Sequence, residues 1–492
     1  MTVPRLSRHA ETRAGVRRPA YLAQRHGVGI VHIGVGAFHR AHQAVYTDEA
    51  LATAGGDWRI AGVSLRSTDI ADALNPQDGL YTLLERGPQG TQARIVGSIA
   101  QVAAAAREPG ATLAALAAPA TRIVTLTVTE KAYGLARGTG VDPENPAIAA
   151  DLANPRAPAG VVGLLVEALR RRRAAGVAPF VALCCDNLPD NGSLLGRGVV
   201  DFARRVDPGL ADWIAVEAAF PSSMVDRITP APTEATRALA RALTGCEDHA
   251  AVETEPFSQW VIEDRFPSGR PAWEAGGALF VDRIAPYERM KLRMLNGTHS
   301  MLAYCGYLAG HAHVRDVMAD PRLAVLVGRH LAAAQATLTG VDGVDLDRYA
   351  SELGARFANP AIAHQTYQIA MDGTEKLPQR IFEPAVETLE RGGDVRAFAF
   401  AAAAWMRFCL GRADDGAAYA LRDPREDQIR RALAGAGTAR AISAALHALP
   451  AFVPQRLAES PAWRGHVEAA LAAMLADGMK AAVRAEAAAV VG

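Results

Sequence analysis

The chain has 492 residues, of which 50% are hydrophobic and 21% are charged, a composition typical of soluble globular proteins. Lysine and arginine together number 52, as do aspartate and glutamate, so no net charge favours nucleic acid or an anionic membrane as a partner. The length exceeds one ordinary hydrophobic core, so two domains are expected.

Targeting segments and metal motifs are missing from the sequence. It contains neither a signal peptide nor an apolar run of about 18 residues. The five cysteines form no CxxC pair and no spacing typical of a metal site. An odd number of cysteines without a disulfide framework fits a reducing compartment. We therefore expect a cytoplasmic protein without a membrane partner, a nucleic-acid partner or a bound metal.

After a basic arm, residues 1–27, the chain alternates strand-like and helix-like segments up to about residue 280. The expected strands are 30–33, 58–65, 123–128 and 180–185, and the expected helices are 37–51, 69–74 and 161–173. Such alternation predicts a mostly parallel sheet covered by helices on both faces. Residues 80–102 resemble a hairpin, and residues 137–160, rich in Pro, Gly and Asn, resemble a surface loop.

From about Tyr287 onward the pattern changes to long helices rich in alanine and leucine. The expected helices are 321–338, 394–410, 426–434 and 462–475. Asp320 is a plausible N-cap for the first of these helices, with Pro321 at its first position. We therefore predict an α/β domain over residues 28–284 and a mainly α-helical domain over residues 285–492.

Gly34 and Gly36 follow the first expected strand and open a helix. Two glycines let the backbone turn tightly and approach a pyrophosphate at a helix N-terminus. His39 stands where the usual fingerprint has a third glycine, and a plain strand-to-helix turn is the alternative explanation. The second strand ends without the usual acidic residue, and Arg66 could instead meet a 2′-phosphate. The pattern predicts a Rossmann-type domain that prefers NAD, with NADP not excluded.

Lys291, Asn296 and His299 place an amine, a carboxamide and an imidazole within nine residues of an apolar helical run. At about 100° per residue, Lys291, His299 and Asn296 would fall near ~0°, ~80° and ~140° on one α-helical face. A proton carrier beside groups that hold an oxygen is what alcohol–carbonyl interconversion requires. We expect burial to lower the pKa of Lys291, because a lysine with a pKa of about 10.4 is a poor base. The alternative is a solvated lysine on a helix.

Five motifs together resemble the mannitol dehydrogenase family, the polyol-specific long-chain dehydrogenases. They are HIGVGAFHRAH at 32–42, TVTEK at 127–131, CDNLPDNG at 185–192, MVDRITP at 224–230 and YERMKLRMLNGTH at 287–299. Their joint presence in this order is far more specific than any one motif. The resemblance covers roughly residues 28–460 and implies an NAD-dependent, zinc-independent oxidoreductase.

The resemblance also implies a role for particular residues. Lys291 would be the acid/base, Asn187 and Asn296 would hold the reacting oxygen, and His299 would orient the substrate. Asp226 would line the sugar site, Glu288 would exchange protons between Lys291 and solvent, and Gly34, Gly36 and Phe38 would hold the pyrophosphate. Thr129 and Glu130 follow a strand, where nicotinamide contacts belong. The alternatives are a turn residue for Asn187, an ion-pair partner for Asp226 and a charge near a helix start for Glu288, and without the resemblance they would be preferred for two of the three.

A sixth motif, QTYQIAMDGTEKLPQR at 365–380, resembles fructuronate reductases more than mannitol 2-dehydrogenases. The mannitol enzymes tend to have arginine where Gln368 stands. A uronate needs a cation for its carboxylate, and Lys376 and Arg380 are candidates, with surface charges as the alternative. We therefore expect reduction of a ketouronate such as D-fructuronate to D-mannonate. Alternatives are a polyol dehydrogenase for mannitol or arabinitol and an inactive nucleotide-sensing protein. The chain would be a monomer or a small homo-oligomer.

Overall fold

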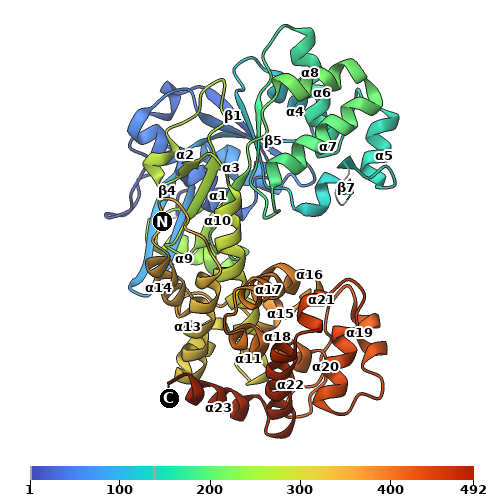
Figure 1. The fold of residues 1–492 in the computed structure, drawn as a ribbon. Helices are drawn as coiled ribbons and strands as arrows, with labels where there is room; N and C mark the ends of the chain where they lie inside the picture. Colours follow the sequence, from blue (N-terminus) through green and yellow to red (C-terminus); the bar gives the residue numbers. More distant parts are fainter. Residues whose placement is uncertain (1–2, 137–139, 492) are drawn as a thin grey trace. The chain divides into compact units, whose positions relative to one another are not determined.

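The computed structural model describes residues 3–136 and 140–491 of the chain. The chain forms two compact units, Met1–Ala285 and Pro286–Gly492, which are described separately. Figure 1 shows the mixed strands and helices of the first unit in blue to yellow-green and the helices of the second in yellow to red. Among the described residues, no helix is both long and apolar enough to cross a membrane.

The first unit is built on a five-stranded parallel sheet. Its strands, in spatial order, are β5 (Ile99–Ala104), β2 (Arg59–Ser64), β1 (Val28–Ile33), β6 (Ile123–Leu126) and β9 (Val181–Cys184). The chain winds outward in one direction from β1 to β5 and in the other from β6 to β9. The order therefore reverses between β1 and β6, where doubly wound sheets place their ligands.

Helices cover both faces of this sheet. Alternate residues of β1 enter two separate cores, with Ile30 in one and Val31 and Ile33 in the other. One core includes α2 (Gln43–Ala54) and α3 (Asp69–Leu74). The other includes α4 (Pro109–Ala117), α6 (Val161–Ala174), α7 (Asn191–Val206) and α8 (Pro208–Glu217). Burial on both faces explains why these strands read as nearly continuous hydrophobic runs.

Smaller elements surround the main sheet. The strands are β3 (Tyr81–Gly87), β4 (Gly90–Val96), β7 (Leu135–Ala136), β8 (Gly140–Val141), β10 (Ser223–Asp226), β11 (Val252–Thr254), β12 (Gln259–Glu263) and β13 (Leu279–Val281). The helices are η1 (Ala23–Arg25), α1 (Ala37–Ala41), η2 (Asn75–Gln77), η3 (Glu130–Tyr133), α5 (Pro146–Ala153), α9 (Glu234–Thr244) and η4 (Trp273–Gly276). In the N-terminal arm, Leu6 is fully buried and packs with Leu80, Ile95 and Cys246.

Three of the expected elements differ from the structure. The helix expected over 37–51 breaks at His42, whose φ of −125° and ψ of −94° are not helical. The hairpin within 80–102 forms as β3 and β4, but β5 joins the main sheet beside β2. The expected loop at 137–160 contains α5, which Asn145 caps and Pro146 begins. Residues 137–139 of that loop lie outside the described residues.

The second unit is helical, which confirms the expected fold class. Its helices are α10 (Ala285–Met290, which begins at the unit boundary), η5 (Lys291–Gly297), α11 (Thr298–Leu308), α12 (Val314–Ala319), α13 (Pro321–Ala336), α14 (Leu346–Phe357), α15 (Thr366–Ala370), α16 (Gly373–Leu377), η6 (Pro378–Phe382), α17 (Glu383–Glu390), α18 (Arg396–Phe408), α19 (Glu426–Ala432), α20 (Ala439–His447), α21 (Gln455–Ala458), α22 (Pro461–Ala476) and α23 (Met479–Val491). The Asp320 carboxylate accepts the Arg322 N–H at 2.9 Å, as expected for an N-cap of α13.

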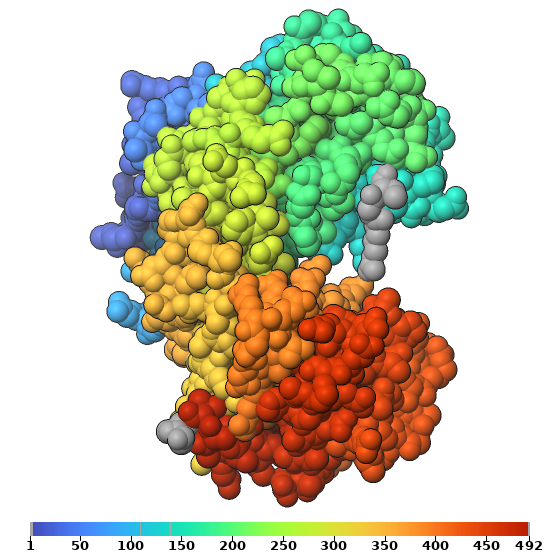
Figure 2. Space-filling view, in the orientation of Figure 1, coloured from blue at the N-terminus to red at the C-terminus, as the bar shows by residue number. Residues whose placement is uncertain are grey.

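Two helices, α11 and α18, form the centre of this unit. In α18 every residue from Ala397 to Phe408 is buried, and in α11 only Tyr307 is partly exposed. Helices that are apolar on all sides belong in the middle of a bundle. On the visible face the second unit, coloured yellow to dark red, has a closely packed surface (Figure 2).

Candidate active site

The glycine turn lies at the point where the strand order reverses. Gly34 has a φ of +99°, and a Cβ there would lie 2.1 Å from the Thr127 carbonyl oxygen, so only glycine fits. Gly36 is exposed, and a Cβ there would meet only the Gly34 oxygen at 3.8 Å. Gly34 is thus required by the fold, whereas Gly36 leaves open space at the start of α1. This cradle fits the close backbone approach that a pyrophosphate needs.

A buried histidine fixes the Gly34 carbonyl. His32 Nε2 lies 3.0 Å from the Gly34 oxygen, and Nδ1 lies 2.7 Å from the Thr125 hydroxyl. Burial lowers the pKa of His32 to about 3, so the ring is neutral. Because a carbonyl only accepts, Nε2 carries the proton and Nδ1 accepts from Thr125. The ring of His39 stacks on His32 with centroids 3.3 Å apart, which gives the residue in the third-glycine position a packing role.

The other residues expected at the cofactor lie near the carboxyl ends of β1, β2 and β6. The Phe38 ring stacks on His42, with centroids 5.0 Å apart. Arg66 is exposed in the loop after β2. Thr129 and Glu130 are exposed just after β6. Their roles at the cofactor stay predictions.

Asp186 lies two residues after β9, and its carboxylate binds the loop after β6. Its two carboxylate oxygens accept the backbone N–H groups of Val128 and Thr129, each at 3.0 Å. The Tyr133 hydroxyl also donates to Asp186, at 2.6 Å. The carboxylate therefore ties the end of β9 to the loop after β6. No local pattern around Asp186 predicts this role.

Two residues expected at the substrate belong to the first unit. Asn187 follows Asp186 and is exposed. Asp226 is the last residue of β10 and is 5% exposed. Its neighbour Arg227 is also buried, and it donates to the Ala41 carbonyl at 2.6 Å and to Glu85 at 2.5 Å. Arg227 is thus committed to the fold.

Lys291, Asn296 and His299 lie on one continuous helical segment of the second unit, but that segment is not an α-helix throughout. Residues Lys291–Gly297 form the π-helix η5, with α10 before it and α11 after it. The angles expected from about 100° per residue are therefore wrong here. In a π-helix the hydrogen bonds join residues five apart, so Lys291 and Asn296 are neighbours along the axis. Lys291 and His299 are each 8% exposed.

A second π-helix, η6, packs against the first. A Cβ on Gly297 would lie 2.8 Å from the Arg380 carbonyl oxygen, so glycine is needed for this close approach. Arg380 Nη1 also lies 3.4 Å from the Asn296 carbonyl oxygen and 3.3 Å from Ser300 Oγ. Burial lowers the pKa of Arg380 to about 10. Arg380 therefore supports the backbone that carries Asn296.

An ion pair that the sequence did not reveal anchors the other side of η5. Arg293 is buried and donates to both carboxylate oxygens of Glu387, at 2.8 and 2.5 Å. It also donates to the Thr337 carbonyl at 3.1 Å. The guanidinium holds the pKa of the Glu387 carboxyl below its usual value. Paired and hydrogen-bonded in this way, a buried charge can be accommodated.

His299 lies among other basic groups. Burial lowers its pKa well below the usual value, and the charges of His364, Arg356 and Arg380 act in the same direction. The His299 ring contacts His364 edge to face, with centroids 5.4 Å apart. Its buried Nε2 has no hydrogen-bond partner among the described residues. A neutral imidazole is therefore available to bind a ligand.

Lys376 belongs to the same group of basic side chains. Its Nζ donates to the carbonyls of Ile369 at 3.2 Å and Met371 at 2.6 Å, and lies 3.8 Å from the Asp372 carboxylate. Burial, and next the charge of Arg380, lower the pKa of Lys376. Gln368, by contrast, is exposed on α15.

Glu288 lies three residues before Lys291 in α10 and is partly exposed. This spacing places it one helical turn before the lysine.

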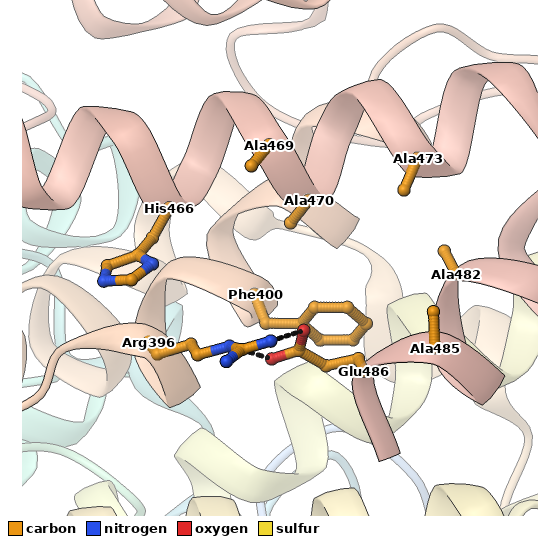
Figure 3. Close-up of a pocket in the computed structure, with 9 residues that line it drawn as sticks. All are labelled: Arg396, Phe400, His466, Ala469, Ala470, Ala473, Ala482, Ala485 and Glu486. Atoms are coloured by element: carbon orange, nitrogen blue, oxygen red, sulfur yellow. Dashed lines mark hydrogen bonds and ion pairs between the residues drawn. The ribbon is translucent and has the colours of Figure 1, made fainter. Parts of the chain in front are cut away.

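A separate cavity of about 250 Å³ lies between α18, α22 and α23 (Figure 3). Alanines line much of it, and Arg396 donates to both carboxylate oxygens of Glu486 at 2.9 Å. None of the residues that the sequence singled out as functional lines this cavity. It is therefore distinct from the groups around Lys291.

The sheet order, with a glycine turn beside its point of reversal, defines a Rossmann-type nucleotide-binding unit. The comparisons with known proteins narrow this class. The model of the mannitol dehydrogenase Rossmann domain matches residues 28–275, and that of the mannitol dehydrogenase C-terminal domain matches residues 283–475. The chain belongs to the mannitol dehydrogenase family of oxidoreductases.

Relatives cover most of the chain. It is 43% identical to the D-mannonate oxidoreductase of Escherichia coli (strain K12) over 83% of this chain and 85% of that protein. It is 41% identical to a mannitol 2-dehydrogenase of Cereibacter sphaeroides over 85% of this chain and 89% of that protein. The solved mannitol 2-dehydrogenase of Pseudomonas fluorescens, in a ternary complex with NAD and D-mannitol, is 36% identical, with a TM-score of 0.83 over 98% of this chain and 99% of that one.

Proposed function

We propose that this protein is an NAD-dependent oxidoreductase that interconverts a carbonyl and an alcohol on a sugar acid, with D-fructuronate and D-mannonate as the pair. The observation that carries the proposal is the buried Lys291 in a π-helix that also contains Asn296. The similarity to a D-mannonate oxidoreductase along most of the chain supports the substrate class.

NAD would supply or accept the hydride. We assign its pyrophosphate to the turn of Gly34, Gly36 and Phe38, because the exposed Gly36 leaves room for a close approach. Thr129 and Glu130 would lie at the nicotinamide end, after the strand beside β1. Arg66 is exposed where the adenosine ribose binds in such folds, so NADP is the second choice of cofactor.

The proton would move at Lys291 Nζ. In reduction the ammonium form donates to the carbonyl oxygen, and in oxidation the neutral amine accepts the hydroxyl proton. The carboxamides of Asn296 and Asn187 would donate hydrogen bonds to the same oxygen and stabilise its developing charge. His299 would orient the substrate as a neutral ring, and Glu288 would exchange the Lys291 proton with solvent. Asp226 would bind a sugar hydroxyl.

The basic groups of the second unit favour a sugar acid over a polyol. His299, His364, Lys376 and Arg380 influence one another's charges, and burial lowers the pKa of each. Because His299 is neutral, the positive charge lies on Lys376 and Arg380, and a substrate carboxylate would stabilise their charged forms. Lys376 is the group we assign to the carboxylate, because it matches a position of the family motif; the carboxylate would add to its contacts with the Ile369 and Met371 carbonyls. Gln368, exposed on α15, is a contact for the sugar chain at most.

A polyol dehydrogenase is the second candidate, since a mannitol 2-dehydrogenase is 41% identical to this chain. The test is a spectrophotometric screen of NADH and NADPH oxidation with D-fructuronate, D-fructose and pentuloses. We expect the highest kcat/KM with D-fructuronate and NADH. Higher kcat/KM with D-fructose would favour the polyol enzyme. Cofactor binding without turnover of any substrate would favour a nucleotide sensor.

We also propose a location and an oligomeric state for the enzyme. All five cysteines are buried free thiols, which supports a reducing cytoplasm as its location. A monomer or small homo-oligomer is the form we propose. Size-exclusion chromatography with light scattering measures this directly.

A further inference from the structure

Thr129 has a backbone conformation that threonine rarely adopts. Its φ of +76° and ψ of 150° fall in a region used almost only by glycine. A β-branched residue is strained in this conformation, because its Cβ crowds the backbone there. The residue is exposed and follows β6 by three positions, so packing in the core does not require this conformation. Strain of this kind persists only where surrounding contacts enforce it.

Asp186 supplies the enforcing contacts. Its carboxylate accepts the N–H groups of Val128 and Thr129, and the Thr129 carbonyl accepts the Ala132 N–H at 3.0 Å. The Tyr133 hydroxyl, which is buried, holds the same carboxylate in place at 2.6 Å. Both backbone polar groups of Thr129 are thus engaged by the protein. The Thr129 side chain is what remains for a ligand at this exposed position.

The loop that contains Thr129 lies beside the glycine turn, at the carboxyl edge of the sheet. The loop after β6 adjoins the glycine turn, because the Thr127 hydroxyl donates to the Gly34 carbonyl at 2.8 Å. β6 and β9 are neighbours, so Asp186 and Thr129 lie at the same carboxyl edge of the sheet. Nucleotides in such folds bind outside this edge.

We propose that Asp186 is a positioning residue that holds the strained Thr129 backbone and so presents the Thr129 side chain to the nicotinamide end of the bound dinucleotide. This inference rests on the proposed NAD-dependent function. It assigns Asp186 no contact with the substrate or the cofactor. The role is specific to the nicotinamide half, since the pyrophosphate turn has its own support from His32.

The test compares two aspartates of the same unit that make the same kind of contact. Asp151 also accepts two consecutive backbone N–H groups, those of Ala159 and Gly160, each at 2.9 Å, but in the segment around α5. Asp186→Asn and Asp151→Asn each replace an acceptor oxygen by an amide that faces an N–H group. Each full-length variant is titrated with NADH and with ADP-ribose, which lacks the nicotinamide, and kcat and KM are measured with D-fructuronate.

For Asp186→Asn we expect weaker NADH binding and a kcat lower by roughly 10- to 100-fold, as for a misplaced reactant. Its affinity for ADP-ribose should stay within about twofold of the wild-type value, which is the usual limit of coupling between independent sites. Asp151→Asn should retain the wild-type kcat and ratio of NADH to ADP-ribose affinity. Wild-type NADH kinetics in Asp186→Asn, or an equal loss of both ligands' affinities, would overturn the inference.

A second variant covers the case in which Asp186→Asn does not fold. Thr129→Val keeps the branched shape and the Asp186 contacts but removes the hydroxyl. We expect the same selective loss of NADH binding and kcat, and unchanged NADH kinetics would overturn the inference. A wild-type protein that binds neither NADH nor ADP-ribose would instead overturn the proposed function, and the inference with it.

Discussion

Replacing Thr129 by glycine should stabilise the first unit. Glycine adopts a φ of +76° without a Cβ penalty, so the substitution releases about 1–3 kcal/mol of backbone strain. The greater freedom of glycine in the unfolded chain offsets about 0.5–1 kcal/mol of this. The net gain is therefore about 0–2.5 kcal/mol, although most substitutions destabilise a protein. The Asp186 contacts survive, because they involve backbone N–H groups.

Thr129→Ala is the matched control. Alanine keeps the Cβ and hence the strain, while the rest of the exposed side chain contributes only about ±0.5 kcal/mol. Differential scanning calorimetry should resolve the transition of the first unit, where 1 kcal/mol corresponds to about 2–4 °C. We expect Thr129→Gly to melt a few degrees above Thr129→Ala. If it melts at the same temperature or below, the strain at this position is not stored in the folded state.

Three further outcomes are expected. Lys291→Ala should lower kcat by roughly 10²- to 10⁴-fold with NADH binding intact, because it removes the proton donor, and added primary amines should restore part of the rate. Lys376→Met should lower kcat/KM for D-fructuronate by roughly 10- to 100-fold, the value of a hydrogen bond to a charged group, and for D-fructose by less. His330→Gln should reduce the acid sensitivity of the second unit, since burial lowers the pKa of His330 to about 4. The unfolded chain binds that proton below pH 6.5 and the folded chain does not, so this histidine costs about 2 kcal/mol of stability between pH 6.5 and 5.

A specific result would contradict each of these predictions. A Lys291→Ala enzyme with most of its activity would remove the lysine from the chemistry. Equal losses with both sugars in Lys376→Met would place that residue at a part of the site that both substrates share. For His330, unfolding by denaturant at several pH values would contradict the reasoning if the variant and the wild type lost stability in parallel below pH 6.5.

Elements with local signals could be predicted from the sequence. The helix α3 (Asp69–Leu74) has the expected ends, and α13 begins at Pro321 with Asp320 as its cap. In both, the ends follow from neighbouring residues. The strand β5 was missed because it lies at the edge of the sheet, where Gln101 is exposed and the hydrophobic run is broken.

Features set by distant contacts could not be predicted. The π-helix η5 approaches Arg380 closely at Gly297, 83 positions earlier in the chain, and no local periodicity of the sequence indicates a π-helix there. The strain at Thr129 depends on Asp186, 57 positions further along the chain. The six motifs identified the family, which the comparisons confirm, but the roles of single residues at the site stay predictions.

The two π-helices also bear on how this sequence tolerates insertions and deletions. A π-helical turn holds about one residue more than the α-helical turn it replaces, so η5 sets which faces of the helix its own residues occupy. Losing a single residue from 291–297 would replace the wide turn by an α-helical turn, which leaves the flanking segments nearly in phase but moves side chains within 291–297 to other faces of the helix. Variants of residues 291–297 should therefore keep the number of residues. A design that moves this segment into another protein would also have to include η6, which packs against it.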